Sequence, residues 1–167
     1  LSSVSEKIGY EYKRMKQKKF TREGVDLVVP DSVIVHEDLH YSGANRERQS
    51  LHLMLPANSG IEPLPVILYI HGGAWEHGTK DLQVERLLPF VESGNYAAVA
   101  INYRFTDEAA WPAQLDDCVM VLEYLRERSL EYGLDTKNIG LWGSSSGAHM
   151  AAMLGLQKEL ELKCVVN

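Results

Sequence analysis

The chain has 167 residues, of which 45% are hydrophobic and 24% charged, a composition typical of one globular domain. Its formal net charge of −6 argues against a nucleic-acid partner, because the phosphates would repel it. No apolar run is long enough to span a membrane and no signal segment opens the chain, so the sequence predicts a cytoplasmic protein of unspecified oligomeric state.

The first thirty residues differ in composition from the rest. Residues 2 to about 20 are polar and end in a basic cluster, which is typical of a helix with a solvated face: Lys13, Arg14, Lys16, Lys18 and Lys19. We interpret residues 1–30 as an N-terminal helical extension and residues 31–167 as part of a single α/β domain.

Two antiparallel strands are expected next. The segments 33–36 and 49–55 are rich in apolar residues, and the second carries leucine at every other position from Leu51 to Leu55. The polar turn over 42–46 between them favours a hairpin. A loop containing Pro, Asn, Ser and Gly then covers residues 56–65.

A buried strand then leads into a glycine-rich turn. The apolar run 64–70 continues directly into His71-Gly72-Gly73-Ala74-Trp75. Glycines immediately after a strand let the backbone direct its N–H groups toward a ligand, as an oxyanion hole requires. The segment therefore indicates an oxyanion loop.

Helices and strands alternate after this turn. The pattern predicts an amphipathic helix, a buried strand, a helix opened by Trp-Pro and a further strand, over 80–93, 96–101, 111–133 and 139–142. Gly94 and Gly133 are expected to end the two helices. This alternation predicts an α/β fold, with a mostly parallel sheet, an antiparallel N-terminal start and helices on both faces.

The turn Gly143-Ser144-Ser145-Ser146-Gly147 joins the last of these strands to a helix-forming segment. A G-x-S-x-G turn needs small residues around the serine, because strand and helix pack closely and the serine backbone is strained. It places Ser145 Oγ at a helix N-terminus, which favours negative charge. Alone, the pattern also fits a loop that caps a helix; together with the upstream oxyanion loop it predicts a serine hydrolase.

These motifs together resemble a known family. Asn102-Tyr103-Arg104, Trp111-Pro112-Ala113-Gln114, Tyr132-Gly133-Leu134-Asp135 and the two glycine-rich turns are similar to those of α/β-hydrolase esterases. The resemblance covers about residues 33–167 and is greatest to the hormone-sensitive-lipase-like branch, with its acetyl-xylan and feruloyl esterase and kynurenine formamidase relatives. It implies the N-terminal part of an α/β-hydrolase fold and hydrolysis of short-chain acyl or acetyl esters through an acyl-enzyme, without cofactor or metal.

The resemblance also implies roles for residues. Ser145 is the nucleophile, and the backbone N–H groups of Gly73, Ala74 and Ser146 form the oxyanion hole, supported by His71, Gly72, Trp75, Gly143 and Gly147. Ser146 stands where the family commonly has alanine, and Ala74 replaces the third glycine of the commoner HGGG. In the family the acid and the histidine follow the serine along the chain. Residues 146–167 hold no aspartate and only His149, so we expect a fragment without its general base.

Other polar residues have structural interpretations. His149 lies on the helix and is not expected to act as the base, and His71 is expected to orient the oxyanion loop by bonding to a carbonyl. The remaining histidines show no metal-site spacing. We expect Asp116 and Asp117 to interact with a helix dipole, and the two cysteines, Cys118 and Cys164, to lie in the core.

Three alternatives stay open at this stage. Trp75 either forms the wall of an acyl pocket or packs beneath the oxyanion loop. An arylformamide or a peptide is a possible substrate in place of the ester, because the same site stabilises any tetrahedral oxyanion. The competing class of function is a non-catalytic hydrolase fragment that binds ligands or partners.

Overall fold

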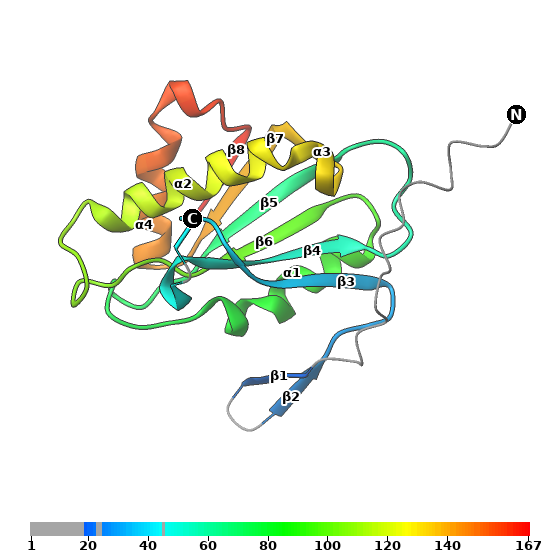
Figure 1. Cartoon of the computed structure of the whole chain (residues 1–167), viewed down its shortest axis with the longest axis horizontal. Coiled ribbons are helices and arrows are strands. Elements are labelled where there is room, and N and C mark those ends of the chain that lie inside the picture. The colour runs from blue at the N-terminus through cyan, green and yellow to red at the C-terminus, as the bar shows by residue number, and fades with distance from the viewer. Residues whose placement is uncertain (1–18, 23–24, 45) are drawn as a thin grey trace, which may run out of the picture.

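The computed structural model describes residues 19–22, 25–44 and 46–167 (Figure 1). Its main sheet has six strands: β3 (Val33–His40), β4 (Ser50–Pro56), β5 (Leu64–Ile70), β6 (Ala97–Ile101), β7 (Leu134–Gly143) and β8 (Cys164–Val166). Their spatial order is β3-β4-β6-β5-β7-β8. The pairs β3–β4 and β4–β6 are antiparallel and the other pairs are parallel. The predicted mostly parallel sheet with an antiparallel start is confirmed.

Helices cover both faces of this sheet (Figure 1). The α-helices are α1 (Val84–Glu92), α2 (Ala113–Glu127), α3 (Ser129–Tyr132) and α4 (Ser146–Gly155). Short 3-10 helices are η2 (Glu47–Gln49), η3 (Lys80–Gln83) and η4 (Lys158–Leu160). The α1 helix belongs to one hydrophobic cluster, whereas α2 and α4 belong to a second cluster on the other face.

Burial on both faces of the sheet explains why the sequence of β5 is a continuous apolar run. Leu68 and Ile70 pack in the cluster with α2 and α4, whereas Tyr69 between them packs in the cluster with α1. Successive strand residues point to opposite faces, and both faces are covered here, so polar residues have no exposed side to occupy. Complete burial of one such leucine stabilises the fold by roughly 1.5–3 kcal/mol.

The N-terminal region differs from the predicted helical extension. Lys19–Arg22 (β1) and Val25–Val28 (β2) form a separate antiparallel pair, so the helix predicted over residues 2–20 is wrong at residues 19 and 20. The β-branched residues Thr21, Val25 and Val28 favour extended backbone, which outweighed the basic pattern in this segment. Residues 1–18 of the prediction lie outside the described residues, and the division of the chain at residue 30 stays a prediction.

Two smaller predictions also change. The second predicted helix does not continue to Gly133: α2 ends at Glu127, α3 follows, and Gly133 then adopts the left-handed conformation with φ of 65°. Cys118 is buried as predicted, but Cys164 is exposed, on the edge strand β8. Among the described residues, no helix is long and apolar enough to cross a membrane.

Candidate active site

The loops after β5, β6 and β7 meet at one edge of the sheet. These three strands are parallel neighbours, with β5 hydrogen-bonded to both of the others, so their carboxyl ends lie side by side. In open α/β sheets this edge is where ligands bind. The two glycine-rich turns of the sequence follow β5 and β7, and the fold therefore brings them together.

The serine turn has a strained backbone at its centre. Ser145 has φ of 51° and ψ of −119°, in a region that residues with a Cβ atom seldom adopt. Its side chain is exposed, whereas Ser144 is half-buried and Ser146 is buried. Such a conformation costs about 1–3 kcal/mol and persists only where the surrounding structure enforces it.

Close packing of glycines enforces this turn. A Cβ atom on Gly147 would overlap the carbonyl oxygen of Ile70, and one on Gly143 would overlap the backbone of Gly147. The first turn of α4 thus lies directly against the end of β5. The need for small residues that the sequence predicted at these two positions has this steric cause.

The predicted oxyanion loop touches the serine turn through Gly72. A Cβ atom there would lie 2.7 Å from the Ser144 carbonyl oxygen and 3.1 Å from Ser145 Cβ. The chain then turns sharply, with φ of 130° at Gly73 and 52° at Ala74. The Gly73 carbonyl oxygen accepts hydrogen bonds from the N–H groups of residues 76 and 77, at 2.9 and 3.0 Å.

The predicted N–H donors are free of competing backbone bonds. Among the described residues, no backbone carbonyl accepts a hydrogen bond from the N–H groups of Gly73 or Ala74. Ser146 is the first residue of α4, and the first N–H groups of a helix have no acceptor within it. The two turns that carry these three N–H groups are in contact at Gly72.

His71 is buried beneath the loop. Its ring stacks on Tyr103 with centroids 4.4 Å apart, and the Tyr103 hydroxyl donates to the His71 carbonyl at 2.9 Å. Nδ1 lies 2.7 Å from the Gly72 carbonyl oxygen, so it is the nitrogen that carries the proton. Burial lowers the pKa of His71 to about 4, which keeps the ring neutral. This is the carbonyl contact that the sequence predicted.

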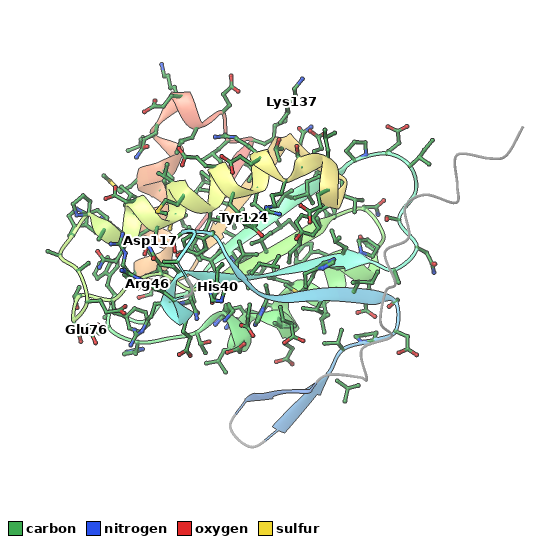
Figure 2. The ribbon with its side chains drawn as sticks, in the orientation of Figure 1. His40, Arg46, Glu76, Asp117, Tyr124 and Lys137 are labelled. Carbon is green, nitrogen blue, oxygen red and sulfur yellow. The ribbon has the colours of Figure 1, made fainter. Side chains whose placement is uncertain are left out.

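Asp117 has a different role from the predicted interaction with a helix dipole. Its buried carboxylate accepts hydrogen bonds from the Arg104 side chain at 2.7 and 3.0 Å, from the Arg104 N–H at 2.8 Å and from Gln49 Nε2 at 2.8 Å. The bonds to Asp117 raise the pKa of Arg104 above its ordinary value. Asp117 lies on α2 over the sheet (Figure 2), where it fixes the loop after β6.

A small hollow lies beside Trp75, at the end of the first glycine-rich turn. It has a volume of about 200 Å³ and is lined by Trp75, Thr106, Trp111, Gln114 and His149. The His149 ring centroid is 5.5 Å from each tryptophan ring, and the Thr106 N–H donates to the Trp75 carbonyl at 3.0 Å. Trp75 lines this hollow and also packs against the core cluster beneath it, so whether it forms the wall of an acyl pocket stays a prediction.

Ser145, the predicted nucleophile, has no histidine hydrogen-bond partner among the described residues. Within residues 19–22, 25–44 and 46–167, no side chain forms a hydrogen bond with Ser145 Oγ, and His149 instead contacts the tryptophans. In the same part of the chain, no group of three or more His, Cys, Asp or Glu residues is arranged to hold a metal ion. The site as described consists of a serine and backbone donors.

The sequence matches the family model described as BD-FAE over residues 51–166, which is more than half of the chain. The chain belongs to the BD-FAE family. Among curated relatives of this BD-FAE chain, esterase LipC of Mycobacterium tuberculosis is 30% identical over 95 residues, 57% of this chain and 24% of the relative. Probable carboxylesterase 5 of Arabidopsis thaliana is 32% identical over 152 residues, 80% of this chain and 47% of the relative.

Solved structures support the fold of this BD-FAE chain. An inhibited esterase B from Lactobacillus rhamnosis matches with a TM-score of 0.70 at 25% identity, over 83% of this chain and 47% of that one. The fold is the α/β-hydrolase fold that the resemblance implied. The chain spans less than half the length of each of these relatives.

Proposed function

We propose that the whole protein is a serine carboxylester hydrolase. The observation that carries this proposal is the strained, exposed Ser145 in contact with Gly72, at the start of a loop whose N–H groups at Gly73 and Ala74 have no backbone acceptor. The relatives named as esterases and carboxylesterases support it.

The reaction begins with attack of Ser145 Oγ on the ester carbonyl carbon. The hydroxyl proton passes to a general base, and the carbonyl oxygen becomes an oxyanion that accepts the N–H groups of Gly73, Ala74 and Ser146. Loss of the alcohol, which takes up a proton, leaves an acyl-enzyme. Water then attacks this ester, releases the carboxylic acid and returns the proton to Ser145.

The size of the hollow supports a short acyl chain or an acetyl group. About 200 Å³ bounded by Trp75, Trp111 and His149 gives room for a small apolar group. Arylformamides and peptides stay alternatives, because they form the same oxyanion. The cytoplasmic location also stays a prediction.

Turnover of a matched ester series tests the proposal. We expect the whole protein to hydrolyse p-nitrophenyl acetate and butyrate faster than the decanoate, with an initial burst of one p-nitrophenol per Ser145. Aryl formamides and a peptide nitroanilide are measured in parallel. If the folded protein hydrolyses the amides but not the esters, the proposed substrate class changes from esters to amides. If it hydrolyses neither, the non-catalytic alternative is supported.

Gly73→Val is expected to lower kcat about a hundredfold or more, the usual cost of losing one oxyanion donor. A Cβ atom at Gly73 would overlap the His77 carbonyl oxygen, and φ of 130° is strained for any side chain. The matched control is Gly60→Val, since a Cβ atom at Gly60 meets nothing within 4 Å. Equal kcat in the two folded variants would show that the donors lie elsewhere.

A further inference from the structure

The oxyanion loop ends at a lysine whose side chain runs into the protein. Lys80 is only 3% exposed, and its Nζ lies 2.9 Å from Asp38 Oδ1 on β3. Its backbone N–H donates to Asn102 Oδ1 at 2.7 Å. A buried ammonium is strongly unfavourable unless a carboxylate pairs with it. The ion pair therefore holds the start of η3 against β3.

The following residue makes a second connection to the same strands. Asp81 Oδ1 lies 2.7 Å from Nε2 of His52, a β4 residue that is 1% exposed. The Asp38 N–H donates to His52 Nδ1 at 3.3 Å, so the ring proton is on Nε2 and points to Asp81. This hydrogen bond holds the pKa of the Asp81 carboxyl well below its usual range.

An irregularity in β3 makes both connections possible. The register with β4 shifts between His36 and Leu39, and Asp38 within it has φ of 52°. A bulge of this kind changes the direction of a side chain. Here it directs the Asp38 carboxylate to Lys80 while the N–H of the same residue faces His52.

Direct contacts join this anchor to the nucleophile. A Cβ atom on Gly78 would lie 2.5 Å from His71 Nδ1 and 2.6 Å from the Gly72 carbonyl oxygen, so the end of the loop packs on its beginning. Gly72 in turn packs on Ser144 and Ser145. A shift of Lys80 and Asp81 would thus displace the segment that carries the oxyanion donors.

We propose that Asp38, His52 and Lys80 are positioning residues that hold the oxyanion loop in its active geometry. This inference rests on the function proposed above. The three residues do not touch the substrate; they act through Gly78 and Gly72 on the N–H groups of Gly73 and Ala74. Loosening the anchor affects the transition state more than substrate binding, because the oxyanion forms only after attack.

Lys80→Met tests the anchor, with Lys137→Met as the matched control. Lys80→Met removes the buried charge and leaves Asp38 solvated, since that side chain is 61% exposed. Lys137 is exposed and lies across the molecule from Glu76 of the loop (Figure 2). We expect kcat for p-nitrophenyl acetate to fall about tenfold to a hundredfold in Lys80→Met, the scale of a misplacement of about 1 Å, with KM nearly constant. Amide hydrogen exchange in residues 72–79 is expected to quicken.

A second pair of variants covers the case in which Lys80→Met fails to fold. Asp81→Ala removes the acceptor for His52 at a side chain that is 45% exposed, whereas Asp81→Asn retains an oxygen there. We expect a lower kcat in Asp81→Ala and recovery in Asp81→Asn. Unchanged kcat in folded Lys80→Met, or in Asp81→Ala, overturns the inference. If the whole protein hydrolyses no ester but amide exchange in residues 72–79 is faster in Lys80→Met, the proposed function is refuted. The positioning of the loop by these residues is then still supported.

Discussion

Ser145→Ala is expected to abolish ester hydrolysis and fluorophosphonate labelling of the whole protein. Loss of the nucleophile lowers kcat by about 10⁶ in a well-studied serine protease. Alanine also has a Cβ atom, so the strained backbone at φ of 51° costs the variant no more than the native residue. The fold should therefore survive, and the loss reports chemistry.

Neighbouring serines provide the controls for this experiment. Ser146→Ala retains the backbone N–H at the start of α4, and Ser144→Ala alters a half-buried side chain in the same turn. We expect both variants to be labelled. Labelling that persists in Ser145→Ala, or that maps by mass spectrometry to Ser144 or Ser146, would show that Ser145 is not the nucleophile.

The sheet and the two turns could be predicted because their requirements are local. Strand β5 is buried on both faces and is therefore a continuous apolar run, whose predicted bounds agree with Leu64–Ile70. Gly143 and Gly147 are needed where backbones touch, and this need is visible in a short sequence pattern. Local sterics also explain why the pattern indicated strain at Ser145.

The polar pairs could not be predicted because their partners are distant in the sequence. Asp117 appeared to be one of two acidic residues near a helix start, and nothing local identified Arg104 and Gln49 as its donors. The buried Lys80 depends on a bulge in β3 that directs the exposed Asp38 carboxylate toward its ammonium. At the N-terminus, the basic pattern favoured a helix that ends at about residue 20, whereas residues 19–22 pair with 25–28 as antiparallel strands.

No described side chain forms a hydrogen bond with Ser145 Oγ, and a second large effect is expected from this. We expect residues 1–167, expressed alone, to hydrolyse p-nitrophenyl acetate with no more than the residual of about 10³-fold over water that binding and an oxyanion hole provide without a triad. The only histidine after Ser145 is His149, whose ring faces Trp75 and Trp111. In the family, by resemblance, the base and its acid follow the serine.

The measurement compares purified, monodisperse residues 1–167 with the whole protein and with His149→Ala in both. We expect the whole protein to exceed residues 1–167 by several orders of magnitude, and His149→Ala to reduce neither rate by more than a few-fold. His149 contributes an aromatic wall to a hollow of about 200 Å³, so its loss should alter KM more than kcat. If residues 1–167 instead turn over the ester at the rate of an ordinary esterase, and His149→Ala abolishes this activity, His149 is the base. His149 is the histidine that α4 carries, one turn after Ser145.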